Sequence, residues 1–258
     1  MVAVSRGMAT VGPGVAVDWR YGLASPLLSL LQSDDLDLLA TCCQLVRVSE
    51  GHHLARDEGA AVVSVLEGAA TATCFTPGGH PAIITMLGPG SSWGLPAAFG
   101  HPDPATELHA LSEVAALVVA GNHLRRLASE RPSISHACLA AMAHDLAEQH
   151  RTAVVFAHAT TFERVVFRLV ELATRWGEFD DTNGRGMRVS LPLTQEDLAF
   201  WACTSQKSTA KALSQLRLAG IIETGRRHLT ILDLPRLRQR DPQLRGDAEL
   251  QRFLTALH

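Results

Sequence analysis

Residues 194–218 read TQEDLAFWACTSQKSTAKALSQLRL, and this stretch decides the fold that we expect at the C-terminal end of the chain. Thr194 followed by Asp197 resembles a capping box with Asp in place of Glu, which predicts that a short helix begins here. The polar triplet CTS interrupts the apolar pattern, and Thr204 or Ser205 then caps a second helix that runs to the end of the stretch. Two short helices joined by a tight turn predict a helix-turn-helix.

Both lysines of the chain lie on the second of these helices, whereas the other basic residues are arginines. Lys207 and Lys211 are four residues apart and share one face, so their charges repel by about 0.2–0.5 kcal/mol unless an anion lies beside them. A helix whose N-terminal end enters the major groove meets phosphates as well as base edges. Lys can donate to guanine or to phosphate, and Gln206 can pair with adenine. The pattern predicts a DNA-recognition helix, and a solvated charged face is the alternative.

The segment GIIETGRRHLTILD, residues 220–233, predicts two strands joined by a basic turn. A basic hairpin directly after such a helix pair is a winged helix, whose wing lies along phosphates. Residues 193–240 carry eight basic and four acidic side chains, a net charge of +4, so the rest of the chain carries −7 and the whole chain −3. This asymmetry is typical of a DNA-binding end on an acidic body. We assign the DNA contacts to Thr194, Ser205, Gln206, Lys207, Ser208, Lys211, Arg226 and Arg227.

The pattern is different between Val46 and Val119, where short β-branched runs are punctuated by Gly and Pro. Strands of this length with turn signals between them predict a small antiparallel barrel or sandwich, and TPGGHP at 76–81 is typical of a hairpin tip. Upstream, apolar residues at helical spacing in 25–47 predict one or two short helices. Before them we expect a loose tail rather than a signal peptide, and no membrane span, because no run of 18 apolar residues occurs.

Residues 132–159, PSISHACLAAMAHDLAEQHRTAVVFAHA, predict one long helix that begins near Pro132. Apolar positions recur at alternating steps of three and four residues, which is the spacing of a coiled-coil seam, and a single polar residue within it favours pairing because such residues fix register. The alternative is one long helix that packs on its own domain. We assign the homodimer interface to Leu139, Met142, Leu146, Gln149, Ala153 and Phe156.

A Gly-punctuated barrel, a long helix and a winged helix, in this order, resemble the Crp/Fnr family of bacterial transcription regulators. The motifs that carry the resemblance are GHHLARDEGAAVVSVLEGAATA in the first strands, LGPGSSWG before the family's phosphate-binding cassette, and LTQEDLAFWACTSQKSTAKAL in the helix-turn-helix. The resemblance implies an α+β fold with an antiparallel, cyclic-nucleotide-binding-like barrel, a dimerisation helix and a C-terminal winged helix. The implied divisions are a flexible tail in 1–21, a sensor domain in 22–131, the dimerisation helix in 132–159, the DNA-binding domain in 160–240 and an extension in 241–258.

The resemblance also implies how such a protein works. A cytoplasmic homodimer would bind double-stranded DNA at a pseudo-palindromic operator whose half-sites lie about one helical turn apart. Whether RNA polymerase is a further partner is left open, and no membrane partner is expected. In the recognition helix, Lys207 replaces the acidic residue with which family members commonly read cytosine, so we expect an unusual half-site.

The phosphate-binding cassette departs from the pattern of nucleotide-binding family members, in which Gly-Glu is followed by a later Arg. Here Leu95 follows Gly94, and Ala105 and Thr106 lie where the Arg and its neighbour belong. The phosphate then loses its charge-assisted partner, and leucine offers no acceptor to a ribose. We therefore expect no cofactor and no cAMP bound in the usual manner. The resemblance places two further pocket candidates, Gln149 and His150, on the long helix. They could contact a different ligand or could simply be polar residues of the dimer interface, and both alternatives stay open.

Composition and motifs argue against several other classes of protein. At 47% hydrophobic and 19% charged residues the chain is globular rather than disordered. The five cysteines are irregularly spaced, which suits a reducing cytosol and matches neither a disulfide scaffold nor an iron–sulfur cluster. The histidines lack zinc-ligand spacing and a diagnostic haem motif, so we expect no metal. Catalytic signatures such as GxSxG, a P-loop or HExxH are missing, so we expect no enzyme. Two alternatives stay open. The chain could sense another nucleotide or haem, or it could be a non-DNA interaction module with a relic winged helix.

Overall fold

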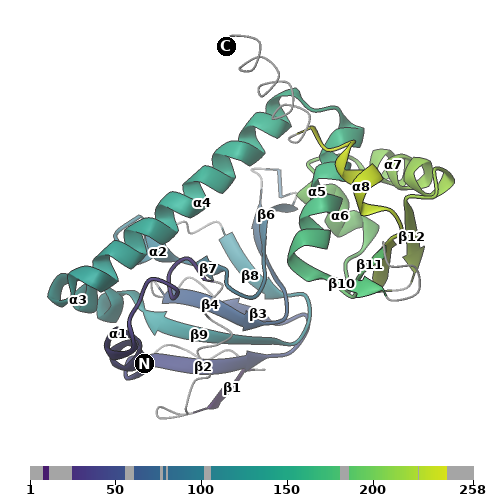
Figure 1. Cartoon of the computed structure of the whole chain (residues 1–258). Coiled ribbons are helices and arrows are strands. Elements are labelled where there is room, and N and C mark those ends of the chain that lie inside the picture. The colour runs from purple at the N-terminus through teal and green to yellow at the C-terminus, as the bar shows by residue number, and fades with distance from the viewer. Residues whose placement is uncertain are drawn as a thin grey trace, which may run out of the picture. The chain divides into compact units, whose positions relative to one another are not determined.

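The computed structural model describes residues 8–11, 25–55, 61–75, 78–79, 81–101, 106–180, 186–225 and 227–242 (Figure 1). The chain divides into two compact units, Met1–Ala147 and Glu148–His258. The division falls inside the long helix of residues 132–158. Within the described ranges, no helix combines the length and the apolar composition that crossing a lipid bilayer requires.

The N-terminal unit contains two antiparallel sheets, as the short Gly-punctuated strands predicted (Figure 1). One sheet has the strand order β1-β2-β9-β4-β7, and the other has the order β3-β8-β5-β6. The strands are β1 (Met8–Val11), β2 (Cys43–Val48), β3 (His53–Ala55), β4 (Ala61–Glu67), β5 (Ala70–Phe75), β6 (Pro81–Leu87), β7 (Ser92–Trp93), β8 (Thr106–Ala110) and β9 (Val114–Ala120). Because β5 and β6 pair out to Phe75 and Pro81, the TPGGHP segment joins them as the predicted hairpin.

Side chains from both sheets meet in one hydrophobic core of the N-terminal unit. Its buried members are Val46, Val48, Leu54, Val63, Val65, Ala70, Ala72, Leu87, Leu108, Ala110, Val114, Ala116 and Val118. Successive side chains of a strand point to opposite faces of its sheet. On β8, Leu108 and Ala110 therefore enter this core, whereas Glu107 and His109 lie on the other face and are partly exposed.

Helices cover the outer face of the first sheet. They are α1 (Ser33–Ala40), α2 (Leu95–Ala98), α3 (Gly121–Glu130) and the start of α4 (Pro132–His158). In a second core, Leu39, Leu124 and Ile134 of these helices cluster with Val62 and Val119, which are cross-strand partners on β4 and β9. The same strands thus serve both cores with alternate residues, and α4 is anchored in the unit at its N-terminal end.

A short strand lies within the segment for which we expected only a loose tail. β1 pairs antiparallel with β2, from Met8 opposite Val48 to Val11 opposite Leu45. The pairing gives partners to backbone groups along an edge of β2 that would otherwise remain open. A loose tail is therefore not what residues 8–11 form, and the rest of the segment 1–21 lies outside the described residues.

The C-terminal unit contains α5 (Thr161–Trp176), α6 (Gln195–Trp201), α7 (Gln206–Leu218), α8 (Leu234–Arg238) and a four-stranded sheet of order β10-β11-β13-β12. Its strands are β10 (Gly177–Asp180), β11 (Gly186–Val189), β12 (Ile222–Gly225) and β13 (His228–Ile231). The helix-turn-helix and the following hairpin are confirmed. The edge strand β10, which pairs Phe179 with Met187, was not predicted, because a polar segment of the sequence separates it from its partner strand.

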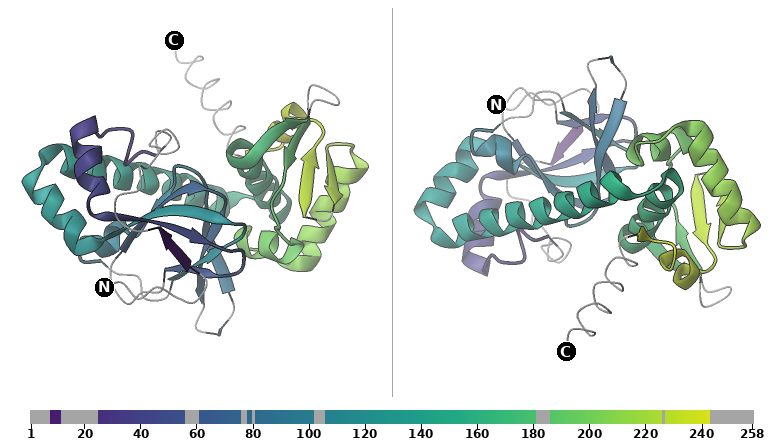
Figure 2. Two further views of the ribbon diagram at one scale, coloured as in Figure 1. Left: turned by 90° about the horizontal axis from the view of Figure 1, so that it is seen from below. Right: turned by 90° about the horizontal axis from the view of Figure 1, so that it is seen from above.

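The helix α4 is continuous over 27 residues, which corresponds to about 40 Å of helix axis (Figure 2). It begins at Pro132, as predicted, and ends at His158. The next helix begins at once because Thr160 and Glu163 form a capping box. The Oγ1 of Thr160 accepts a hydrogen bond of 3.3 Å from the Glu163 amide, and a Glu163 carboxylate oxygen accepts one of 2.9 Å from the Thr160 amide.

Candidate nucleic-acid interface

The two helices of the candidate interface are capped as the sequence predicted. At the start of α6, the Thr194 Oγ1 accepts a hydrogen bond of 3.0 Å from the Asp197 amide, and the Asp197 carboxylate accepts one of 2.9 Å from the Thr194 amide. Ser205 caps α7, because its Oγ accepts a hydrogen bond of 3.2 Å from the Ser208 amide. These caps satisfy amides that a helix N-terminus leaves without intrahelical partners, so the sequence itself fixes where α7 begins.

One face of α7 is buried and the opposite face is exposed. The buried residues are Thr209, Ala212, Leu213 and Leu216, and Trp201 at the end of α6 is also fully buried. Gln206, Lys207 and Lys211 are exposed, and the two lysines are separated by one helical turn. Ala210 is only partly buried, whereas its neighbour Thr209 is fully buried. The lysines therefore lie on the side of α7 that a partner can reach.

The turn between α6 and α7 passes through a left-handed residue. Cys203 has φ +47 and is exposed. A non-glycine residue in this conformation costs about 1–2 kcal/mol. Hydrogen bonds hold the turn nonetheless, since the Thr204 amide donates to the Ala199 carbonyl at 3.0 Å. The neighbouring helix α5 supplies further bonds to the same turn.

Two arginines of α5 bind the carbonyl groups of this turn. Arg164 donates to Cys203 at 3.3 Å and, near the end of α4, to the carbonyl of Phe156 at 2.8 Å. Arg168 donates to Trp201 at 3.1 Å. Sequence reasoning missed this pair, although two arginines four residues apart on an otherwise apolar helix face were a usable signal. We call Arg164 and Arg168 the arginine clasp.

The second member of the clasp, Arg168, is a buried charge with an ion-pair partner and three aromatic neighbours. The Arg168 side chain is 5% exposed and pairs with Glu171 at 2.7 Å. Its guanidinium also lies over the rings of Phe156, Phe167 and Trp201, at 4.6 Å from the Trp201 centroid. Burial lowers the pKa of Arg168 from its ordinary value, and the Glu171 carboxylate opposes this effect. The hydrogen bond to the Trp201 carbonyl ties α5 to the turn that precedes α7.

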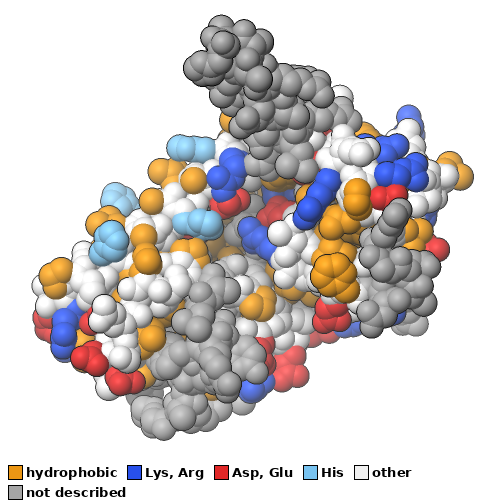
Figure 3. All heavy atoms as spheres, in the orientation of Figure 1, with side chains coloured by type: hydrophobic (Ala, Val, Ile, Leu, Met, Phe, Trp, Pro, Cys, Tyr) orange, Lys and Arg blue, Asp and Glu red, His pale blue; other side chains and the backbone are white. Residues whose placement is uncertain are grey.

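The hairpin beside α7 has the register of a wing. Gly225 of β12 lies opposite His228 of β13, and Arg227 at the tip is exposed with φ +64. Arg226 lies outside the described residues. The Arg217 guanidinium of α7 donates a hydrogen bond of 2.9 Å to the Thr224 hydroxyl of β12, which ties the recognition helix to the wing. In the space-filling view, Lys and Arg side chains gather over the region of α7 and α8 (Figure 3).

The predicted seam residues of α4 fall into two groups. Leu139 is 61% exposed and Leu146 is 52% exposed, and Gln149 and Ala153 are exposed as well. Met142 packs against the second core of the N-terminal unit, and the Phe156 ring meets the Phe167 ring edge to face with centroids 6.4 Å apart.

The exposed stripe of α4 is therefore displaced around the helix from the seam that we predicted. It consists of Leu139, Ala143, Leu146, His150, Ala153, Val154 and Ala157, among which Val154 is 64% exposed. Hydrophobic and histidine side chains line the visible face of α4 (Figure 3). We call these residues the α4 stripe.

The predicted pocket residues are distributed over both units. Gly94 has φ +94 at the start of α2, and a Cβ there would overlap the Ala61 carbonyl, so only glycine fits. Leu95 is 1% exposed and belongs to the second core, and Thr106 is 8% exposed. Ala105 lies outside the described residues. Gln149 and His150 are exposed and belong to the C-terminal unit.

The chain is similar in sequence and in fold to known transcriptional regulators. Residues 163–240 match the model of the Crp-like helix-turn-helix domain. A CRP-like cAMP-activated global transcriptional regulator of Mycobacterium tuberculosis is 27% identical over 164 residues, which are 64% of this chain and 72% of that protein. The structure of FixK2 from Bradyrhizobium japonicum superposes with a TM-score of 0.67 at 21% identity, covering 77% of this chain and 97% of that chain.

A transcriptional regulator of the CRP family from Thermus thermophilus shows the same fold. It superposes with a TM-score of 0.63 at 19% identity, over 75% of this chain and 95% of that chain. The sequence relative and the two structures thus agree with the order of parts that the motifs predicted.

Proposed function

We propose that this member of the Crp/Fnr family of transcriptional regulators acts as a homodimer that presents two α7 helices to successive major grooves on one side of duplex DNA. The observation that carries the proposal is the exposure of Gln206, Lys207 and Lys211 on a helix whose opposite face is buried. Capping by Ser205 places these side chains in the first two turns, which is the part of a recognition helix that reaches base edges.

Base contacts and phosphate contacts fall on different elements. Gln206 and Lys207 lie in the first turn of α7 and read bases, because amide and ammonium groups match the donor and acceptor pattern of the major groove. Arg227 at the wing tip contacts phosphates, which adds affinity without sequence preference. The hydroxyl groups of Thr194 and Ser205 are exposed, and each donates a hydrogen bond, to the Asp197 carboxylate at 2.6 Å and to the Ser208 hydroxyl at 3.0 Å. A contact of either hydroxyl with a phosphate oxygen would replace that hydrogen bond.

The α4 stripe supports pairing of two chains. Leu139, Leu146 and Val154 are large apolar side chains that are more than half exposed. Burying one such side chain contributes about 1.5–3 kcal/mol, so a pair of chains that covers the stripe has a substantial driving force against the cost of association. Two parallel copies of a helix with this repeat pair as a coiled coil. A twofold axis along the stripe then gives two half-sites about one helical turn apart.

The sensor barrel does not bind cAMP in the usual manner. Leu95 is packed into a core and offers no acceptor to a ribose, and neither Ala105 nor Thr106 can replace an arginine against a phosphate. Such a regulator carries no catalytic activity and acts in the cytoplasm, where its operator DNA is. An effector of another kind would bias two orientations of the DNA-binding units, and contact with RNA polymerase would follow at activated promoters.

Genome-wide occupancy mapping followed by fluorescence anisotropy on the recovered sites tests this function. We expect a pseudo-palindromic site that binds far more tightly than scrambled DNA, and a logarithmic affinity that falls linearly with the logarithm of salt concentration. Two half-sites on one duplex should bind more tightly than one half-site at equal protein concentration. A full chain that shows no sequence preference at any salt concentration would instead be the interaction module with a relic winged helix.

A further inference from the structure

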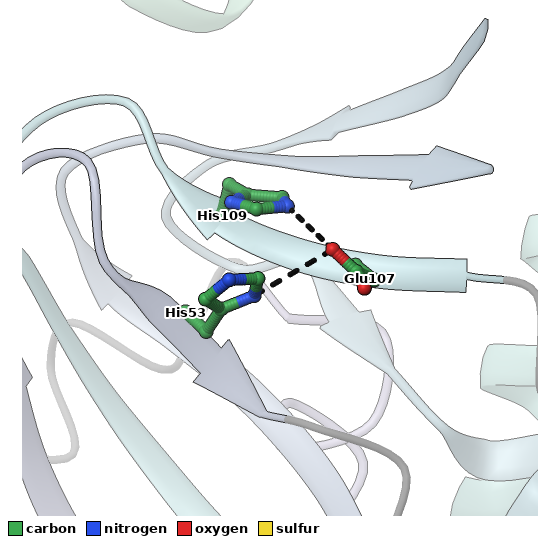
Figure 4. Close-up of side chains that lie close together, drawn as sticks. All are labelled: His53, Glu107 and His109. Atoms are coloured by element: carbon green, nitrogen blue, oxygen red, sulfur yellow. Dashed lines mark hydrogen bonds and ion pairs between the residues drawn. The ribbon is translucent and has the colours of Figure 1, made fainter. Parts of the chain in front are cut away.

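Three potential metal ligands meet on the outer face of the second sheet of the N-terminal unit (Figure 4). They are His53 on β3 and Glu107 and His109 on β8. The His109 Nε2 lies 3.1 Å from a Glu107 carboxylate oxygen, and the His53 Nδ1 lies 3.8 Å from the same oxygen. The two imidazole rings are 4.1 Å apart at their centroids. All three ligand atoms lie within 4.8 Å of one another.

The strand register brings these residues together from distant parts of the sequence. Glu107 and His109 are two residues apart on β8, so both side chains leave the same face of the sheet. Antiparallel pairing of β3 with β8 places His53 directly opposite His109, and a register shift follows before Ala55 pairs with Leu108. No local spacing in the sequence reveals this cluster, which is why we expected no metal site from the histidine pattern.

The distances are close to those of a tetrahedral metal site. Bonds of about 2.0–2.1 Å from zinc to nitrogen or oxygen set ligand atoms about 3.3 Å apart at the corners of a tetrahedron. The two distances to the Glu107 oxygen, 3.1 and 3.8 Å, lie on either side of this value, and no pair of the three ligand atoms is more than 4.8 Å apart. The side chains of His53, His109 and Glu107 are 24, 31 and 40% exposed, so they are held by the sheet and are still accessible to an ion from solution.

The three ligands favour transition-metal ions over the hard cations Mg²⁺ and Ca²⁺. Imidazole favours Zn²⁺, Fe²⁺, Ni²⁺ and Cu²⁺, and the hard cations Mg²⁺ and Ca²⁺ prefer sites made of oxygen ligands. Two histidines with one carboxylate form the ligand set of open sites, in which a fourth position holds water or an exchangeable ligand. We propose that His53, Glu107 and His109 bind one divalent transition-metal ion per chain, with Zn²⁺ as the best match.

This site is separate from the DNA interface, and its existence does not depend on the proposed function. It lies in the N-terminal unit, whereas α7 and the wing belong to the C-terminal unit. Metal uptake is measured on the protein alone. A change in operator affinity on adding metal is a second and independent measurement, so failure of DNA binding leaves the metal result standing.

Cobalt titration of the full-length protein after chelator treatment tests the proposal. We expect one equivalent of Co²⁺ to produce the visible ligand-field bands of a low-coordinate nitrogen and oxygen site, and added Zn²⁺ to remove these bands. His53→Gln, Glu107→Gln and His109→Gln should each lower the Co²⁺ affinity by at least about tenfold. The matched control is His52→Gln, an exposed histidine next to the cluster and outside it, which should bind as the unaltered protein does.

A second measurement needs no variant and so does not depend on how well the variants fold. Diethylpyrocarbonate modifies accessible neutral histidines, and mass spectrometry locates the adducts. Zn²⁺ should slow modification of His53 and His109 and leave that of His52 unchanged. The proposal is wrong when neither Co²⁺ nor Zn²⁺ binds the unaltered chain, or when Zn²⁺ protects none of these histidines. It is equally wrong when His52→Gln weakens binding as much as the three cluster variants do.

Discussion

The Nε of Arg168 donates a hydrogen bond of 3.1 Å to the carbonyl of Trp201, the last residue of α6. The same guanidinium pairs with Glu171 and stacks on the Trp201 ring, so it joins α5 to the start of the helix-turn-helix turn. A buried cation with these partners is structural, because removing it leaves the Trp201 carbonyl without its donor and takes one of two cationic partners from Glu171.

Arg168→Met should therefore destabilise the C-terminal unit. We expect a loss of about 3 kcal/mol, at the lower end for a broken buried ion pair, because Arg175 still pairs with Glu171 at 3.0 Å. Hydrogen exchange of the α6 and α7 amides, followed by mass spectrometry, measures this free energy locally. The control is Arg175→Ala, which removes a partly exposed partner of the same carboxylate and should cost less than about 1 kcal/mol. Equal losses for both changes would contradict a special role for Arg168.

Lys207→Ala should reduce sequence discrimination. We expect a loss of about 1–3 kcal/mol on the preferred operator and a much smaller loss on altered half-sites, because the side chain reads a base edge. Arg226→Ala and Arg227→Ala at the wing should weaken binding to all sequences alike and reduce the salt slope by about one unit each. Anisotropy titrations against a panel of single-base operator variants separate the two patterns. A loss of affinity that is equal for all sequences in Lys207→Ala would show that Lys207 contacts a phosphate and does not read a base.

Leu146→Arg should convert the proposed homodimer to a monomer. The substitution places a charge in the centre of the α4 stripe, where the partner chain would bury it without a counter-ion. Sedimentation velocity at micromolar concentration measures the change in mass. The control is His144→Arg, which is also exposed on α4 but lies about 160° around the helix from Leu146. A dimer that persists in Leu146→Arg and is lost in His144→Arg would place the interface on another face.

Calorimetry should detect no saturable binding of cAMP at micromolar concentration, and Leu95→Glu should not create it. Leu95 is 1% exposed in a core, so a carboxylate there is buried without a partner and lowers the unfolding temperature. Leu30→Glu is the matched control, because Leu30 is 48% exposed and the same substitution there should leave stability nearly unchanged. Saturable micromolar binding by the unaltered chain would overturn our account of the cassette.

The cysteines should differ in reactivity, and pH should separate them. Burial raises the pKa of Cys43 to about 12 and that of Cys138 to about 11, so both remain protonated and unreactive at about pH 9. Cys203 is exposed and should react first with iodoacetamide. In urea at the same pH the two buried thiols return to the ordinary value of 9.0 and should react as well. Because the folded chain retains protons that the unfolded chain loses, stability falls as pH rises above about 9.

The sequence predicted an element well when the interactions that form it join residues close together in the chain. The start of α7 was predictable because Ser205 and Ser208 are three residues apart and form the cap between them. The β10 strand was not, since its pairing with β11 depends on residues beyond a polar segment. The contact between His53 and Glu107 was still harder to predict from the sequence, because it depends on the register in which β3 pairs with β8.

The seam of α4 shows a different kind of limit. A repeat of three and four residues identifies an apolar stripe, but it does not tell which apolar side chains the chain uses for its own cores. Met142 and Phe156 fit the repeat and are used internally, whereas Val154 lies off the predicted seam and is exposed. Arg168 reverses the usual expectation that arginine lies at the surface, because three aromatic rings and a carboxylate surround it.

The arginine clasp has a mechanical consequence. Arg164 donates hydrogen bonds to the carbonyls of Phe156 and Ala159 and to that of Cys203. The same side chain therefore holds both the end of α4 and the turn between α6 and α7. Because one guanidinium holds both segments, a displacement of the last turn of α4 would also displace the turn that precedes α7.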